Sequence, residues 1–377
     1  MPGQIIKRGD RSWLVRVFLG RDGQGRRRYL NKTIHGTRRD AERYLHATLC
    51  ARDMGTLVKP TASKVDEFLQ GWLTDIAQSR VCQRTYISYS RLINSYAQPS
   101  IGHLKLADLQ PLDLQRLYGQ LLKRGLSPRT VRYLHAVLHS AFKQAVRWRL
   151  IAANPCDAVE LPRQERRQIA VFTPEEARRF LDAARDDRWY ALFVVALTTG
   201  ARPSEYLALR WSDVDLERRV VTIQRAVWRH GGSYQFSETK TARSRRRVPL
   251  PPSAVEALRQ HRLRQHEQRL KAGPAYTDLD LVFAGETGEP LDISALRRRH
   301  FMPILRRAGL PPMRLYDLRH ACATLLLSEG VHPKVVAERL GHASTQMTLD
   351  VYSHVLPHMQ EEATATLERR LFALGTL

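Results

Sequence analysis

Apolar residues in the first 59 positions recur first at the spacing of short strands and then at the spacing of a helix. The run Gly20–Gly25 between two of these segments has the composition of a tight turn. Thr37, followed three residues later by Asp40, predicts a helix start, and this helix would cover one face of a small sheet. β-Branched and aromatic residues predict the strands of that sheet at Gln4–Lys7, Ser12–Leu19 and Arg27–Ile34.

Residues 64–150 carry apolar positions at helical spacing, so this region is predicted to be all-helical. Ser127 and Pro128 form a strong helix start, because serine caps a helix and proline suits its first position. The expected helices are Lys64–Ala77, Arg84–Tyr96, Leu112–Lys123 and Pro128–Trp148, separated by Pro99, Gly102, Pro111 and Gly125.

Two proline-containing stretches, Met54–Ser63 and Pro155–Ala170, are interpreted as linkers. Beyond the second, Thr173–Glu176 opens a helix with a capping box, and strands are expected at Val220–Ile223, Ala226–Arg229 and Arg246–Leu250. The predicted fold class is α+β and multidomain. Its parts are a small N-terminal β-sheet domain at 1–59, an all-helical domain at 62–156, and a mixed, mainly helical domain with a small antiparallel sheet at 168–377.

The chain has 61 Lys and Arg against 37 Asp and Glu, a formal net charge of +24, which predicts attraction to a polyanion. Nucleic acid and an anionic membrane surface are the two candidates. The longest apolar run, Trp189–Leu197, is nine residues long. A membrane span needs about 20, so nucleic acid is favoured and no membrane partner is expected. The first residues do not resemble a signal peptide, and a cytoplasmic, nucleoid-associated location is expected.

Basic charge is dense at the N-terminus, where residues 1–59 hold 14 Lys and Arg against 5 Asp and Glu. This density favours a DNA-reading sheet, while a plain stability module with a solvated basic surface is the alternative. The basic residues of the predicted strands and turn are Arg16, Arg26, Arg27, Arg28 and Lys32. The four cysteines of the chain are far apart, so no Cys-x-x-Cys metal site is indicated and no cofactor is expected.

The C-terminal domain contains four separated motifs whose residue types make chemical sense together. Taken singly, each has a plainer interpretation: an arginine is often solvated, and a tyrosine or histidine is often structural. Their joint occurrence in this order argues against chance. The motifs are Arg202 in the turn after Gly200, Lys240 in a predicted hairpin opened by Gly231-Gly232, Arg319 in Leu315–His320 near a helix start, and His342 in Leu340–Ala343, ten residues before Tyr352.

By motif order, residue types and spacing, residues 173–377 resemble the tyrosine recombinases, the phage-type integrase family. The helical region, which ends in Ala145–Pro155, resembles the core-site DNA-binding domain of that family. The first 59 residues resemble the arm-site-binding β-domain that integrases of mobile elements add. The resemblance therefore implies a site-specific recombinase that integrates and excises a phage or mobile element.

The resemblance also implies a role for each site residue. Arg202 and Arg319 would bind the non-bridging oxygens of the scissile phosphate, because a guanidinium group can donate two parallel hydrogen bonds. Tyr352 would attack the phosphorus, giving a 3′-phosphotyrosine and a free 5′-hydroxyl. His342 would hydrogen-bond the phosphate, and Glu205 would hold Arg202 or a neighbour in place.

To Lys240 the resemblance assigns protonation of the departing 5′-oxygen, and the composition supports this role. Only 10 of the 61 basic residues are lysines, and Lys240 is the only one between Lys143 and Lys271. Arginine, with an ordinary pKa above about 12, cannot release a proton at working pH, whereas lysine can act as an acid when its surroundings tune it.

The sequence departs from the family at Tyr316, since most members have histidine three residues before the second arginine. A phenol can donate a hydrogen bond to a phosphate oxygen, but with an ordinary pKa near about 10 it is a poor base at pH 7. Tyr316 is thus expected in the usual histidine position, and the acceptor of the Tyr352 proton stays open. His320 is expected on a different face of the helix from Arg319, where it need not substitute.

Two other classes of protein compete with a recombinase. A DNA-binding protein without catalysis is opposed by the intact set of motif residues, and metal-dependent strand transfer needs a carboxylate cluster that this sequence does not suggest. The implied partners are double-stranded DNA attachment sites (core and arm), a homotetramer on DNA, and an excisionase-type directionality factor or host DNA-bending protein. An apolar set after Tyr352 would dock as a helix on a neighbouring copy or pack on its own domain; it comprises Met359, Ala363, Ala365, Leu367 and Leu371.

Overall fold

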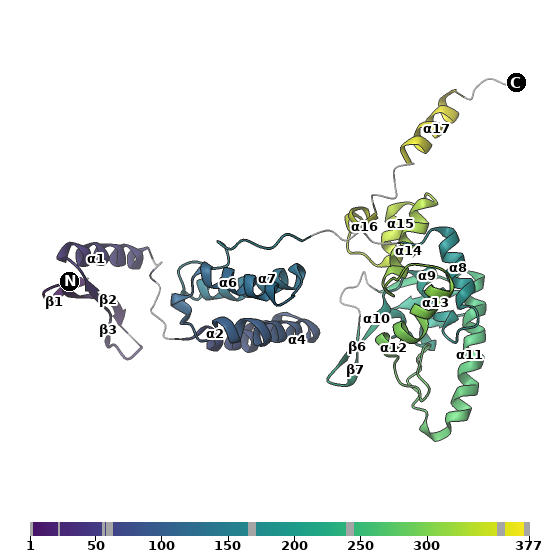
Figure 1. Ribbon diagram of the computed structural model, residues 1–377, viewed down its shortest axis with the longest axis horizontal. Coiled ribbons are helices and arrows are strands. Elements are labelled where there is room, and N and C mark those ends of the chain that lie inside the picture. Colours follow the sequence, from purple (N-terminus) through teal and green to yellow (C-terminus); the bar gives the residue numbers. More distant parts are fainter. Residues whose placement is uncertain are drawn as a thin grey trace. The chain divides into compact units, whose positions relative to one another are not determined.

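The chain forms two compact units, residues 1–166 and 167–377 (Figure 1). The computed structural model describes residues 3–21, 23–54, 57, 63–164, 171–238, 245–352 and 359–372. The predicted fold class is confirmed: a small antiparallel sheet is followed by a helical region and then by a mixed, mainly helical region. The division into three domains remains a prediction.

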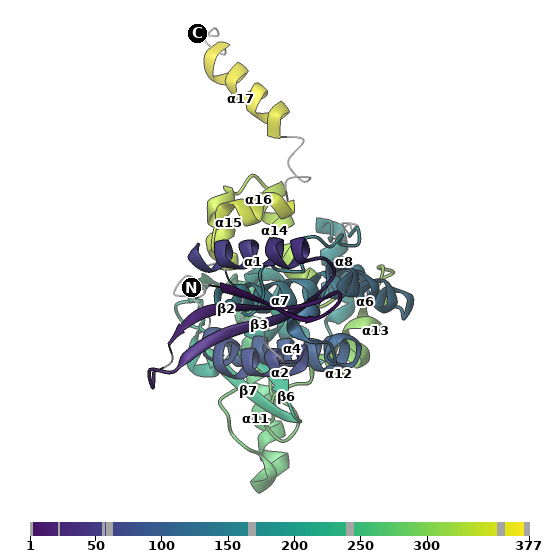
Figure 2. The same ribbon diagram turned by 90° about the vertical axis from the view of Figure 1, so that its left-hand side faces the viewer.

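The first unit begins with an antiparallel sheet that has a helix on one face, as the capping residues predict. Strands β1 (Gly3–Gly9), β2 (Ser12–Arg21) and β3 (Arg27–His35) pair in chain order, and α1 (Arg38–Asp53) follows. Thr37 and Asp40 cap its first turn reciprocally. Figure 2 shows α1 lying along the sheet. Val15 and Val17 of β2 are buried with Leu30 and Ala41, while residues between them face away because a strand alternates its sides.

Among the described residues after α1, the first unit has four long helical rods, and these and the chain that follows them pack around one apolar core. The first is α2 (Val65–Trp72), η1 (Leu73–Ala77) and α3 (Gln78–Arg80), and the second is α4 (Gln83–Leu92), η2 (Ile93–Ala97) and α5 (Gln98–Ile101). After the short turn η3 (Leu106–Asp108) come α6 (Pro111–Lys123) and α7 (Pro128–Arg147). Ser127 caps α7 by accepting a hydrogen bond from the Thr130 N–H, which is the predicted start signal.

The prediction that Pro99 separates two helices is wrong. The second rod continues through Pro99 to Ile101 because the preceding segment, η2, is a π-helical turn. Such a turn has wider, i→i+5 hydrogen bonding, so the rod tolerates a residue without a backbone N–H. The helix therefore ends at Gly102 rather than at Tyr96.

The second unit contains two small antiparallel sheets among its described residues. The larger sheet orders its strands β4, β5, β8, and the smaller is the hairpin of β6 and β7. This hairpin turns at Gly231 and Gly232, both with positive φ, as the sequence predicts. The strands are β4 (Val214–Asp215), β5 (Val220–Ile223), β6 (Arg225–His230), β7 (Ser233–Glu238) and β8 (Arg246–Pro249).

Helices surround α9 (Tyr190–Thr199), which is apolar on all sides and is buried along nearly its whole length. Thr173 and Glu176 form the predicted capping box of α8 (Pro174–Ala184). The other helices are α10 (Pro203–Tyr206), α11 (Pro252–Ala272), α12 (Ile293–Leu296), α13 (Met302–Arg307), α14 (Asp317–Ser328), α15 (Pro333–Leu340), α16 (Thr345–Tyr352) and α17 (Met359–Phe372), with short turns η4 (Trp211–Asp213), η6 (Gly273–Ala275) and η7 (Arg297–Phe301). No helix in the described ranges is long and apolar enough to cross a membrane.

Candidate active site

A glycine at the end of α9 brings three helices together at the site. Gly200 adopts the left-handed conformation, with a φ of 64°. A Cβ atom there would lie 2.5 Å from Leu340 of α15 and 3.2 Å from Cys322 of α14, so only glycine allows this approach. The turn after Gly200 carries Arg202, which therefore lies beside α14 and α15.

Arg202 is held by a buried carboxylate. It is the N-cap of α10, and its backbone N–H donates to Glu205 Oε2 at 2.9 Å while its Nη1 donates to Oε1 at 2.6 Å. Arg246 Nη2 also donates to Glu205 Oε2, at 2.8 Å. Burial alone would raise the pKa of Glu205, but the charges and hydrogen bonds of Arg246 and Arg202 outweigh it and lower the pKa. Glu205 is thus an ionised anchor for two arginines.

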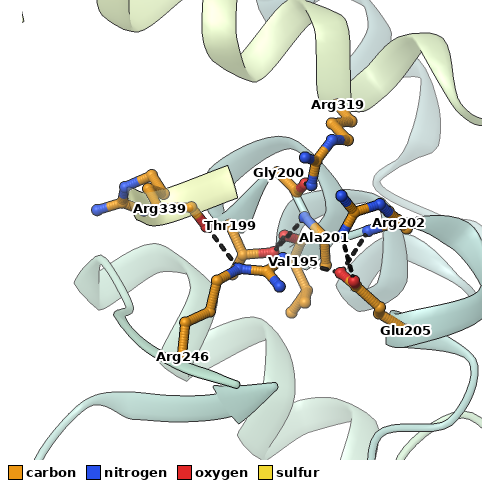
Figure 3. A network of polar contacts seen from close by, with 9 residues as sticks. All are labelled: Val195, Thr199, Gly200, Ala201, Arg202, Glu205, Arg246, Arg319 and Arg339. Carbon is orange, nitrogen blue, oxygen red and sulfur yellow. Dashed lines mark hydrogen bonds and ion pairs between the residues drawn. The ribbon is translucent and has the colours of Figure 1, made fainter. Parts of the chain in front are cut away.

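Arg319 is the third residue of α14, and the residue as a whole is 1% exposed. Its Nη1 donates to Gly200 O at 2.8 Å, whereas its buried Nη2 has no hydrogen-bond partner among the described residues. Burial and the nearby charge of Arg202 lower the pKa of Arg319 to about 10, so it stays charged at neutral pH. Figure 3 shows the guanidinium groups of Arg319 and Arg202 converging beside Gly200.

Positive charge exceeds negative charge in this cluster. Figure 3 shows Arg202, Arg246 and Arg319 close together with Glu205 as their carboxylate, while the Arg339 side chain points away from it and donates through Nη1 to Thr198 O at 2.7 Å. Like charges held together in a partly buried place favour an anion that neutralises them. A cavity of about 450 Å³ lies next to Arg246 and His342; Lys334 and Glu338 also line it, whereas Arg202 and Arg319 do not. The arrangement is suited to binding a phosphate group.

His342 connects this cluster to the helix that ends at Tyr352. It follows Gly341, which closes α15 in the left-handed conformation, and its Nδ1 lies 2.7 Å from the Thr348 hydroxyl. Burial and the charges of Arg319 and Arg202 lower the pKa of His342 to about 4, so its ring is neutral at pH 7. Tyr352 is the last residue of α16, one helical turn after Thr348. The hydrogen bond therefore ties α16 to the arginine cluster.

Tyr316 directly precedes α14, and 38% of its surface is exposed. Its ring meets that of His320 edge-on, at 5.2 Å between centroids, because residues four apart share one side of a helix. Burial is the main cause that lowers the pKa of His320, and His320 in turn helps to lower the pKa of His342. His320 thus lies close to the site although it is not on the face of Arg319.

Lys240 lies outside the described residues, in the segment between β7 and β8. The structure therefore brings together Arg202, Glu205, Arg319 and His342, and it places Tyr316 at the start of the Arg319 helix. Sequence reasoning missed Arg246 and Thr348. Alternation along β8 was an available signal for Arg246, because this strand faces inward at residues 246 and 248.

Comparison with known proteins identifies the family to which this chain belongs. Residues 170–359 match the phage integrase family, and residues 64–122 match the phage integrase N-terminal SAM-like domain. A tyrosine recombinase XerC-like protein of Caldanaerobacter subterraneus is 31% identical over 96% of this chain and 97% of its own length.

Two solved structures share the fold. A Tn1549 transposon integrase in complex with a circular intermediate DNA superposes with a TM-score of 0.68 at 21% identity, covering 80% of this chain and 99% of that chain. A lambda integrase tetramer bound to a Holliday junction superposes with a TM-score of 0.56 at 19% identity, covering 93% and 95%. The fold and family matches define a site-specific DNA recombinase of the tyrosine type. The chain belongs to the phage integrase family.

Proposed function

We propose that this chain integrates and excises a phage or other mobile element by cutting and rejoining DNA attachment sites through Tyr352. The observation that carries the proposal is the fork of Arg319, whose Nη1 is anchored on Gly200 while its Nη2 is buried without a partner among the described residues. An unsatisfied buried donor is costly, and a charge-assisted bond to a phosphate oxygen would satisfy it. The guanidinium group of Arg202 lies close to that of Arg319, and its hydrogen bond to Glu205 holds it there.

In this mechanism the arginines bind the two non-bridging oxygens of the scissile phosphate and stabilise the charge that develops there. In the neutral tautomer that this mechanism uses, His342 Nδ1 accepts a hydrogen bond from the Thr348 hydroxyl, and the ring proton lies on Nε2, where it can donate to a phosphate oxygen. Tyr316 supplies a further hydroxyl donor at the start of α14. These groups hold and polarise the phosphate.

The chemical step is a substitution at phosphorus. The Tyr352 hydroxyl gives its proton to a water molecule or a nearby base, and its oxygen forms a new bond to the phosphorus while the bond to the 5′-oxygen breaks. Lys240 protonates the departing 5′-oxygen. The products are a 3′-phosphotyrosine and a free 5′-hydroxyl. Attack by the 5′-hydroxyl of another strand then reverses the chemistry and releases Tyr352, so the bond energy is conserved in the covalent intermediate.

Strand cleavage should proceed in excess EDTA. The guanidinium groups of Arg202 and Arg319 and the ammonium group of Lys240 supply the positive charge that Mg²⁺ supplies in many other phosphoryl transfers. The measurement is the yield of covalent complex on a suicide duplex, whose nick lets the 5′-hydroxyl fragment diffuse away. A strict requirement for Mg²⁺ in this step would contradict the proposed site.

The implied oligomer is a tetramer on DNA, because exchange between two duplexes requires four cleavages. The lambda integrase tetramer on a Holliday junction has the same fold. We further propose core and arm attachment sites, a directionality factor or DNA-bending protein as partner, and action on chromosomal DNA in the cytoplasm. Helix α17 exposes Leu367, Leu371 and Phe372, an apolar set suited to contact between copies.

The N-terminal sheet is proposed to bind arm sites. Arg16 faces away from the buried valines of β2, lies 5.3 Å from the ring centroid of Tyr29 and bonds Asn31 at 3.1 Å. Deleting residues 1–59 should spare cleavage of a short core-site duplex, because every proposed catalytic residue lies beyond position 200. The deletion should strongly reduce integration into DNA that carries distant arm sites. The sheet would provide a second DNA contact in the same chain, and such a contact raises the overall affinity through effective concentration.

The deletion should also make the binding of arm-containing DNA less dependent on salt, because fewer phosphates are neutralised. Footprinting of the full chain and the shortened chain on the same DNA is the measurement. Identical protection patterns would assign the sheet to protein–protein contact instead of arm DNA.

A further inference from the structure

Arg246 connects two parts of the site that are far apart in the sequence. It is the first residue of β8, and its side chain is 6% exposed. Its Nη2 donates to Glu205 Oε2 at 2.8 Å, and its Nε donates to the backbone carbonyl of Arg339 at 2.6 Å. Figure 3 shows the side chain rising from β8 between these two partners.

The first connection reaches Arg202 through Glu205. The side chain of Glu205 is 3% exposed, and both of its oxygens accept hydrogen bonds from Arg202. Arg246 is the strongest of the charges that keep this carboxylate ionised. Without Arg246, the desolvated Glu205 would depend on Arg202 alone, and the Arg202 guanidinium would be drawn towards Glu205 and away from a phosphate.

The second connection reaches His342 through the end of α15. The last carbonyls of a helix lack partners within the helix, and Arg246 satisfies the one at Arg339. Gly341 and His342 follow directly, and a Cβ atom at Gly341 would lie 3.0 Å from Arg246 Nη1. The guanidinium therefore packs against the turn that presents His342.

We propose that Arg246 is a positioning residue that fixes the Arg202 side chain and the His342 turn relative to each other before cleavage. This inference rests on the recombinase function proposed above. The task needs N–H groups that point in two directions from one rigid plane, which arginine provides and lysine does not. In this role Arg246 acts through Glu205 and the turn after α15, and not by contact with the reacting atoms.

The test is single-turnover cleavage of the suicide duplex by Arg246→Lys, with Arg247→Lys as the matched control on the exposed side of β8. Because misplacement of a reacting group by about 1 Å can cost ~100-fold, the rate at saturating DNA should fall by about 10- to 100-fold in Arg246→Lys. DNA affinity should change little, and the thermal stability should fall only moderately, because one buried hydrogen bond is lost while the charge is kept. Arg247→Lys should cleave like the original chain.

A substrate with a neutral methylphosphonate at the scissile position separates positioning from general damage. A methylphosphonate has no negative charge for Arg202 to neutralise, so cleavage depends less on the exact position of Arg202. The rate defect of Arg246→Lys should therefore shrink at least several-fold on this substrate, whereas a folding defect would persist. Glu205→Gln should show the same partial rescue, and the double variant should be no slower than the worse single variant.

The two proposals fail in distinguishable ways. If the original chain and Arg247→Lys form no covalent complex, the recombinase site itself is wrongly assigned. If both form the complex and Arg246→Lys cleaves at the same rate, only the positioning role is overturned. An equal defect on the phosphodiester and the methylphosphonate would likewise overturn it.

Discussion

Tyr352→Phe should abolish the covalent protein–DNA complex while leaving DNA binding near that of the original chain. The phenolic oxygen is the atom that bonds to phosphorus, and phenylalanine has no nucleophile to replace it. The hydroxyl is one polar group in an interface dominated by phosphate contacts, so its loss should change the affinity by less than about threefold. Denaturing gel electrophoresis after incubation with the suicide duplex measures the complex, and a mobility shift measures binding.

Tyr276→Phe provides the matched control for this experiment. Tyr276 lies beside Arg269 of α11, with the guanidinium carbon 5.8 Å from its ring centroid, and it has no proposed part in catalysis. This variant should form the covalent complex at the original rate. A protein–DNA adduct that survives denaturation in the Tyr352→Phe variant would contradict the assignment of the nucleophile.

Lys240→Arg should retain DNA binding, but its rate of strand cleavage should fall by about 100- to 10,000-fold, the range that a general acid contributes. Arginine keeps the positive charge but cannot release a proton to the departing 5′-oxygen. A 5′-bridging phosphorothiolate should restore the rate, because a thiolate leaves without a proton. Lys271→Arg, at the end of α11, is the control and should cleave both substrates like the original chain.

The phosphorothiolate experiment distinguishes proton transfer from electrostatic support. If Lys240→Arg stays slow on the sulfur substrate, Lys240 has a structural or electrostatic role and the general acid is another group. Equal slowing of both substrates in the Lys271→Arg control would instead indicate a general loss of DNA binding.

Local sequence signals predicted much of the fold. The capping pairs at Thr37 and Thr173 and the glycines of the β6–β7 turn act within a few residues, so the sequence alone identifies them. Gly200 could be placed before Arg202 for the same reason. Its tight packing against α14 and α15 could not be predicted, because that contact joins residues more than 100 positions apart.

The contacts that organise the site depend on long-range geometry. Arg246 reaches Glu205 across 41 positions and Arg339 across 93, so spacing alone could identify it only as an inward residue of a strand. Thr348 lies close to His342 in the sequence, but their contact depends on how α16 turns back against α15, which spacing alone does not specify. The continuation of a helix through Pro99 was missed because a π turn has no clear sequence signature.

The most direct test of the central claim is to identify the residue that carries the DNA. The chain is trapped on a suicide duplex, the complex is digested with nuclease and protease, and the modified peptide is sequenced by mass spectrometry. The account predicts a nucleotide joined through its 3′-phosphate to the oxygen of Tyr352. Attachment to another residue, such as Tyr316, or linkage through a 5′-phosphate, would contradict it.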